Sequence, residues 1–154
     1  MKYKLTDETK EWAWRILHRI EALKDFGNVK AGDKGGWIEK EDNISQDGDC
    51  WVYDDARVYG NACVRGNARV YGNADIKSKD DIIWLTGLGS ENRTTTIFRT
   101  KEGGVRVACG CFSGDLAEFE SRVKETHGDS KYAREYLALI SLAKIHFEED
   151  KENV

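Results

Sequence analysis

The chain has 154 residues and a formal net charge of −4, with 24 basic and 28 acidic side chains mixed along its length. This balance argues against a protein that mainly wraps nucleic acid, and no apolar run is long enough to cross a membrane. Four cysteines without regular spacing, together with the lack of a signal-peptide pattern, indicate a cytoplasmic protein with reduced thiols.

Residues 1–31 are expected to cap the repeats that follow. An apolar stripe at helical spacing runs over residues 12–23, and an alternation typical of a strand runs over residues 14–22. We favour a strand over residues 14–24, after a short helix or turn, because the neighbouring β-structure needs a cover. The alternative of a helix stays open. His18 brings no partner residue and is expected to have only a packing role.

Between Ala56 and Ile76 the sequence repeats itself every six residues. A small residue and a branched aliphatic residue recur two positions apart, and Gly-Asn closes each unit. Such a short fixed period is typical of parallel β-structure in which the two apolar positions face inward. Glycine at each corner supplies the left-handed backbone that the turn needs.

The repeat resembles that of the hexapeptide-repeat, left-handed β-helix family, in which about three hexapeptides make one triangular turn. The resemblance implies a short left-handed parallel β-helix over residues 32–76, with residues eighteen apart stacked on one another. Val52 would then lie under Val70, and Val58 under Ile76. The expected outer pairs are Trp51 with Arg69, Tyr53 with Tyr71, and Arg57 with Asp75.

After a linker at residues 77–81, the chain changes character. Residues 82–147 are expected to form a β-β-β-α-α module, followed by a solvated acidic tail at 148–154. Asp115 and Glu118 have the spacing of a capping box, and Ser130 can cap a second helix. The expected strands are 82–85, 94–99 and 105–109. The predicted fold class is therefore α+β: a short left-handed parallel β-helix followed by a three-stranded antiparallel sheet with two helices.

A glycine-rich turn runs into a hydroxyl-rich strand over residues 87–96. Backbone amides, the guanidinium of Arg93 and the hydroxyls of Thr94, Thr95 and Thr96 are groups that bind a phosphate or a nucleotide, with Asn92 beside them. The turn is not a Walker loop, because no Gly-Lys-Ser/Thr follows. An ordinary hairpin loop explains the same residues without a ligand.

Two smaller polar clusters involve His127. Cys109 and Cys111 lie two apart and could join His127 on a metal ion, but small strand cysteines are the simpler interpretation, and we expect no metal. His127 also lies between two acidic residues and close to Tyr132, where it could act as a base or lie beside an anion. An ordinary polar turn accounts for this cluster equally well.

The Gly-Asn-Ala-Arg-Val-Tyr run, the stretches 90–96 and 109–112, and His127-Gly-Asp are similar to sequences in small proteins of phages and prophages. The resemblance implies a phage protein acting in the cytoplasm of a bacterial host cell. It implies no reaction, and many of those proteins carry more repeats than this chain.

Two functions from different classes follow. The first is a non-enzymatic, phage-derived protein without a cofactor that sequesters a small anionic, nucleotide-derived ligand to counter host antiviral defence. Its expected ligand-binding residues are Asn92, Arg93, Thr94, Thr95, Thr96, His127 and Tyr132. The second is a protein-directed inhibitor of a host defence complex. Its expected contact surface is an exposed ridge of Trp51, Tyr53, Tyr59, Arg65, Arg69 and Tyr71.

Three further expectations complete the sequence-based interpretation. A hexapeptide acyltransferase is a weaker alternative, because residues 28–81 contain no histidine to act as a base. A homo-oligomer is expected, since open sheet edges are normally paired or covered. A ligand should bind in the module at 82–147 or where that module meets the repeats, because Val, Ile and Ala fill the repeat interior.

Overall fold

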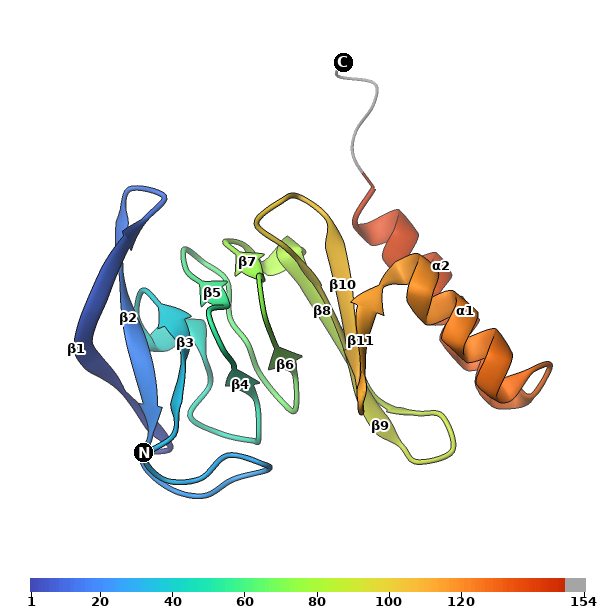
Figure 1. Ribbon diagram of the computed structural model, residues 1–154, viewed down its shortest axis with the longest axis horizontal. Helices are drawn as coiled ribbons and strands as arrows, with labels where there is room; N and C mark the ends of the chain where they lie inside the picture. The colour runs from blue at the N-terminus through green and yellow to red at the C-terminus, as the bar shows by residue number, and fades with distance from the viewer. Residues whose placement is uncertain (149–154) are drawn as a thin grey trace, which may run out of the picture.

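The computed structural model describes residues 1–148 as a row of β-strands that ends in two helices (Figure 1). The predicted acidic tail lies, from residue 149 on, outside the described residues. The first half contains the hairpin strands β1 (Tyr3–Trp12) and β2 (Arg15–Ala22), then β3 (Lys34–Ile38) and a short 3-10 helix (Glu41–Asn43). Four two-residue strands follow: β4 (Trp51–Val52), β5 (Arg57–Val58), β6 (Arg69–Val70) and β7 (Asp75–Ile76).

The predicted fold class is wrong. Within the described residues, β1-β2-β3-β5-β7 form a mixed five-stranded sheet, β4 and β6 form a separate pair, and the C-terminal sheet has four strands rather than three. No left-handed β-helix and no closed or solenoid sheet is formed by this part of the chain. The physical reason is that β2 pairs antiparallel with β3, whereas the repeat strand β5 pairs in parallel with the other edge of β3. The repeat strands therefore continue a mixed sheet that begins with the N-terminal hairpin.

The predicted spacing of the repeats is confirmed even though the fold class is not. Strands eighteen residues apart pair in parallel, with Trp51 opposite Arg69, Val52 opposite Val70, Arg57 opposite Asp75 and Val58 opposite Ile76. Tyr53 and Tyr71 stack with their ring centroids 4.3 Å apart. The corner glycines Gly60, Gly66 and Gly72 share a φ of 62–63°, which L-residues with a Cβ adopt only with strain.

The N-terminal segment is a strand, as favoured, but its surroundings differ from the prediction. A second strand, β1, rather than a helix precedes it, and a turn at Ala13 and Trp14 joins the two. The buried face of this hairpin closes one end of the repeat segment, which we define as residues 32–76. Tyr3 and Ile20 are fully buried there against Trp51 and its neighbours.

The C-terminal module, residues 82–147, contains one strand more than expected. A 3-10 turn (Lys79–Asp81) leads into β8 (Ile82–Leu88), and then come β9 (Arg93–Arg99), β10 (Val105–Cys109) and β11 (Phe112–Asp115), in the spatial order β11-β10-β9-β8. Gly110 and Cys111 form a tight turn, so that Cys109 pairs with Phe112 and starts the unexpected strand β11. Glycine is required there, because Gly110 has a φ of 57°.

The two helices begin where their caps were predicted. Helix α1 (Leu116–His127) has Asp115 and Glu118 in a reciprocal capping box, and Ser130 caps α2 (Lys131–His146). No helix within residues 1–148 is long and apolar enough to span a membrane.

The four-stranded sheet separates two hydrophobic cores, one on each of its faces. Phe98 and Ala108 pack against the core of the repeat segment, whereas Ile97 and Val107 pack against the helices. A partly buried hydrogen bond links the sheet to the repeats: the backbone N–H of Arg69 donates to Thr96 Oγ1 at 3.0 Å. This face of the sheet therefore brings repeat residues and module residues into contact.

Candidate functional site

A cavity of about 230 Å³ lies where the repeat segment meets one end of the four-stranded sheet. We call it the junction cavity. Its lining combines residues from β6 and the neighbouring corners with residues from the start of β9 and the end of β10. The lining residues are Asp49, Asn67, Arg69, Tyr71, Arg93, Thr94, Ala108, Cys109 and Gly110.

The repeat side of the junction cavity is rigidly built. Arg69 is held by strand β6, which pairs with β4, and by its backbone bond to Thr96. Tyr71 is braced by its stack on Tyr53. Burial raises the pKa of Tyr53 to about 12, so this partner ring stays neutral at physiological pH. The repeat thus fixes the backbone of Arg69 and the ring of Tyr71 on the cavity wall.

Arg93, the first residue of β9, supplies the second guanidinium. Its Nε and Nη2 donate to the carboxylate of Glu91, a pairing that raises the pKa of Arg93 and keeps it charged. Its Nη1 lies directly against Gly110, so a Cβ atom at that position would push the exposed Arg93 side chain aside. Gly110 is needed for the hairpin turn because of its φ of 57°.

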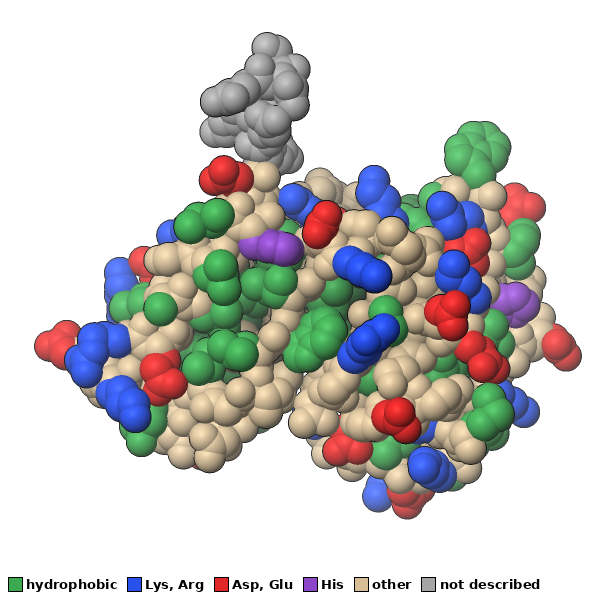
Figure 2. Space-filling view, turned by 180° about the vertical axis from the view of Figure 1, so that it is seen from behind, with side chains coloured by type: hydrophobic (Ala, Val, Ile, Leu, Met, Phe, Trp, Pro, Cys, Tyr) green, Lys and Arg blue, Asp and Glu red, His purple; other side chains and the backbone are tan. Residues whose placement is uncertain are grey.

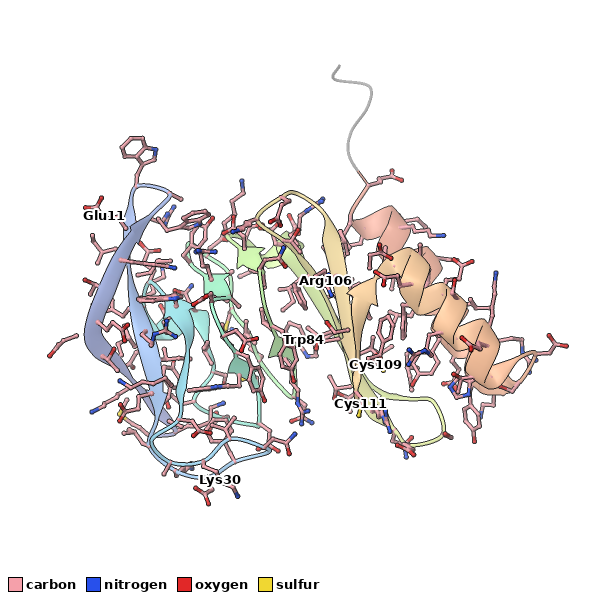
Figure 3. The ribbon with its side chains drawn as sticks, in the orientation of Figure 1. Glu11, Lys30, Trp84, Arg106, Cys109 and Cys111 are labelled. Carbon is pink, nitrogen blue, oxygen red and sulfur yellow. The ribbon has the colours of Figure 1, made fainter. Side chains whose placement is uncertain are left out.

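A second cavity, of about 170 Å³, lies on the helix side of the same sheet end. We call it the helix-side cavity. It shares Arg93 and Cys109 with the junction cavity. Figure 3 shows Cys109 and Cys111 at this end of the β10–β11 hairpin, with Trp84 on the opposite face of the sheet. The other lining residues are Cys111, Phe112, Phe119, Arg122, Val123, Thr126, His127 and Tyr136.

Aromatic contacts position Arg122 and His127 in the helix-side cavity. The guanidinium of Arg122 lies over the ring of Phe112, 5.5 Å from its centroid. His127 stacks on Tyr136 with centroids 5.7 Å apart. Burial and the neighbouring Cys109 raise the pKa of Tyr136 to about 12, and its hydroxyl donates to the carbonyl of Leu88 at 3.3 Å.

Some of the predicted ligand-binding residues line a cavity and the others do not. Arg93, Thr94 and His127 line the two cavities. Thr95 and Thr96 are buried, and their hydroxyls bond to Cys109 Sγ and to the Arg69 backbone instead. The remaining two, Asn92 in the exposed β8–β9 turn and Tyr132 beside His127, line neither cavity.

The predicted contact ridge on the repeats is not an exposed ridge. Trp51 is 1% exposed and Tyr59 is 4% exposed, because both pack inside hydrophobic clusters. The expectation that these two side chains are available to a partner is therefore wrong. Tyr53 is half-buried in its stack with Tyr71. Arg69 and Tyr71 face the junction cavity, and Arg65 is exposed elsewhere.

The cysteines form neither a disulfide nor a metal cluster in the described residues. All four are free thiols, and Cys109 Sγ accepts a hydrogen bond from the hydroxyl of Thr95 at 3.2 Å. Within residues 1–148 no group of three or more His, Cys, Asp or Glu side chains is arranged to hold a metal ion. Cys109 thus belongs to the polar floor between the two cavities.

Sequence reasoning missed Asn67 and Arg122 and gave Arg69 and Tyr71 a different role. Asn67, Arg69 and Tyr71 occupy ordinary outward positions of the repeat, and Arg122 occupies an ordinary surface position of a helix. The one available signal was the eighteen-residue spacing, which puts Tyr71 on Tyr53 and so fixes the outer face from which Arg69 also projects.

No protein-family model matches the chain. Among curated proteins, the chain is similar to one described as an uncharacterized acetyltransferase, YdcK, of Escherichia coli strain K12. The two are 38% identical over 61 residues, which cover 34% of this chain and 19% of that protein. The chain thus spans about a fifth of the length of this relative, and the similarity agrees with the presence of hexapeptide repeats.

Proposed function

We propose that this chain is a non-enzymatic binding protein that sequesters a small anionic, nucleotide-derived ligand in the junction cavity. The observation that carries the proposal is the convergence of two guanidiniums, Arg69 and Arg93, from separate halves of the chain on one cavity. Guanidiniums are the side chains best suited to phosphate, because they form paired charge-assisted hydrogen bonds.

The other lining residues favour a nucleotide over a bare inorganic anion. Asp49 supplies a carboxylate that would repel a simple anion but accepts hydrogen bonds from hydroxyl and amino groups. Asn67 can both donate and accept, and the ring of Tyr71 offers a surface for stacking. A ribose or base beside one phosphate group satisfies all of these residues together.

The biological setting is part of the same proposal. The resemblance of the repeat and of the 90–96 stretch to phage proteins suggests a phage-derived protein that removes a nucleotide signal of host antiviral defence. Binding rather than turnover is favoured because no histidine among residues 1–148 lines the junction cavity, and Cys109 is buried with its sulfur already hydrogen-bonded.

The test is calorimetry and thermal shift with AMP and with adenosine. We expect AMP to bind and raise the melting temperature, and adenosine, which lacks the phosphate, to bind at least tenfold more weakly. Arg69→Ala should weaken AMP binding tenfold or more, whereas Arg65→Ala, an exposed arginine of the same repeats that lines neither cavity, should leave it unchanged. Equal affinity of Arg69→Ala and wild type would refute the proposed site.

Acyl transfer is a second candidate, favoured by the partial similarity to a protein described as an uncharacterized acetyltransferase. In this case His127, which lines the helix-side cavity, is the proposed base. If wild type binds acetyl-CoA with micromolar affinity and transfers the acetyl group, and His127→Ala loses the transfer, then acyl transfer is the function and sequestration is not. Absence of acetyl-CoA binding to wild type would remove it.

We also propose that the protein forms a homo-oligomer through strand β8. Two edge strands of the described sheets differ in charge: β1 carries five charged residues, which oppose edge-to-edge pairing, whereas β8 carries none. An apolar cavity of about 260 Å³ runs beside β8, lined in part by Leu85 and Leu142. Leu142 and Ile145 are 55% and 66% exposed. Figure 2 shows hydrophobic side chains gathered on the C-terminal half of the face that it draws. An uncharged edge can pair with a second copy of itself without charge repulsion.

Light scattering tests the oligomer directly. We expect wild type to exceed the 17.5 kDa of one chain at micromolar concentration, and Leu85→Lys to dissociate it. Thr9→Lys on the already charged edge β1 is the control and should leave the mass unchanged. A wild-type mass of 17.5 kDa would exclude the oligomer.

A further inference from the structure

The helix-side cavity differs from the junction cavity in its charge. Two guanidiniums, Arg93 and Arg122, and the imidazole of His127 line it. Among residues 1–148 no carboxylate lines it, and that of Glu91 pairs with Arg93 without lining the cavity. The junction cavity, in contrast, includes Asp49. The helix-side cavity therefore has the simpler environment for an anionic group, while the junction cavity offers hydrogen-bond acceptors as well.

Arg93 connects the two cavities. It stands at the first position of β9, where the four-stranded sheet ends, and so lines the cavity on each face of the sheet. Glu91 holds Nε and Nη2 on one edge of the guanidinium and thereby directs Nη1 toward Gly110. The same guanidinium thus lines both cavities, and a second anion would have to share it with Glu91.

Packing and aromatic contacts hold the shape of the helix-side cavity. Val123 and Phe119, both buried, anchor α1 against the sheet, and Arg122 rests on the ring of Phe112. His127 is kept in place by its stack on Tyr136. Pre-positioned donors of this kind lose little entropy when a ligand binds.

We infer that the helix-side cavity is a second anion subsite and that the ligand is a nucleotide with at least two phosphate groups. This inference rests on the proposed function. The nucleoside and the first phosphate lie in the junction cavity with Arg69, and the next phosphate passes Arg93 to reach Arg122 and His127. The chain thereby selects nucleoside diphosphates or larger phosphorylated nucleotides over monophosphates.

The experiment compares AMP and ADP by calorimetry on wild type, Arg122→Ala and Arg134→Ala. Arg134 is the control, because it is an exposed arginine near the same interhelical turn that bonds to the carbonyl of Asp129 and lines neither cavity. We expect wild type to bind ADP at least tenfold more tightly than AMP. Arg122→Ala should lose this preference while its AMP affinity changes less than twofold, and Arg134→Ala should behave as wild type.

The outcomes separate this inference from the proposed function. Binding of AMP that depends on Arg69, with no gain for ADP or no effect of Arg122→Ala on ADP, overturns the second subsite and keeps the junction site. Binding of neither nucleotide to wild type overturns the proposed function and the inference with it. A melting scan of each variant shows that the compared proteins are folded.

Discussion

The repeat segment and the C-terminal module solve the problem of burying apolar surface in different ways. The repeat segment uses small and branched side chains at fixed intervals, and its inward residues from Val52 to Ile76 are at most 1% exposed. The C-terminal module has no period, and the two cavities lie at one end of its sheet, one against the repeats and one against the helices. The comparison shows that repetition builds a filled interior, and that room for a ligand arises where the repetition stops.

The largest effect that would sharpen this contrast is expected from Val64→Asp in the repeat interior. Val64 is fully buried, so the substitution places an unpaired carboxylate in an apolar core and should cost about 4 kcal/mol or more. Chemical denaturation followed by circular dichroism measures the loss. Arg65→Asp, at the adjacent exposed position, is the control and should cost less than about 0.5 kcal/mol. A stable Val64→Asp variant would contradict the closed interior.

The opposite behaviour is expected for Arg93→Ala at the edge of the C-terminal module. Arg93 is exposed and pairs only with the exposed Glu91 among described residues, so its removal should change stability by less than about 0.5 kcal/mol. Loss of a charge-assisted bond to the ligand should cost about 1.5–3 kcal/mol, or roughly tenfold to a hundredfold in affinity.

Calorimetry with AMP and a denaturation curve of the same protein sample separate these two quantities. If Arg93→Ala unfolds as readily as Val64→Asp, the division between a structural repeat and a binding module fails. If it binds AMP as tightly as wild type, Arg93 is not part of the site.

The same contrast explains what the sequence could and could not predict. The pairing of Val52 with Val70 and of Val58 with Ile76 follows from a local period, so it could be predicted from the sequence. The pairing of β2 with β3 joins an aperiodic hairpin to the repeats, and no local pattern encodes it. The fold class was therefore wrong although the spacing was correct.

The candidate site was predicted in part for a related reason. Arg93 and Thr94 stood out because a guanidinium and hydroxyls follow a glycine-rich turn. Arg69 and Arg122 have no local signal as ligand residues. Arg69 shares a cavity with Arg93 only because the sheet end docks on the repeats, and Arg122 does so only because α1 packs on the other face of the sheet. Strand β11 was missed because Cys109-Gly-Cys-Phe112 forms a two-residue turn that resembles the end of a strand.

A smaller difference in stability is expected when a turn glycine is replaced by alanine in the repeat segment and in the C-terminal module. Gly72 and Gly103 have φ values of 62° and 88°, and a Cβ atom would meet no other atom within 4 Å at either position. Alanine therefore adds backbone strain alone. In the repeat corner, which is held by paired strands on both sides, we expect Gly72→Ala to cost about 1–2 kcal/mol.

The β9–β10 turn can change its conformation more easily, so Gly103→Ala should cost less than Gly72→Ala. Gly72→Asn serves as the matched variant, because asparagine tolerates the left-handed region and should restore part of the loss. Urea denaturation of the three variants measures the order. Equal losses for Gly72→Ala and Gly103→Ala would show that the repeat corner is no more constrained than an ordinary turn.

The smallest expected effect concerns the acid stability of the repeat side, at Glu39. Burial acts to raise the pKa of this carboxyl group, but hydrogen bonds from the Gly60 backbone at 2.9 Å and from Arg15 at 2.8 Å outweigh it and lower the pKa below its ordinary value of 4.5. A carboxyl group with a lowered pKa in the folded state stabilises the protein above pH 4.5 and loses this contribution as the pH falls through its folded pKa. Because the pair is partly exposed, the contribution should be about 0.5 kcal/mol, or roughly 1–2 °C in melting temperature.

Glu39→Gln should therefore melt below wild type at pH 7 and at the same temperature as wild type near pH 3. The control is Glu11→Gln, which changes an exposed β1 residue that has no ion pair among described residues, and it should melt with wild type at both pH values. A deficit of Glu39→Gln that persists unchanged at pH 3 would mean that the amide disturbs packing and that the charged bridge to Arg15 is not what stabilises this corner.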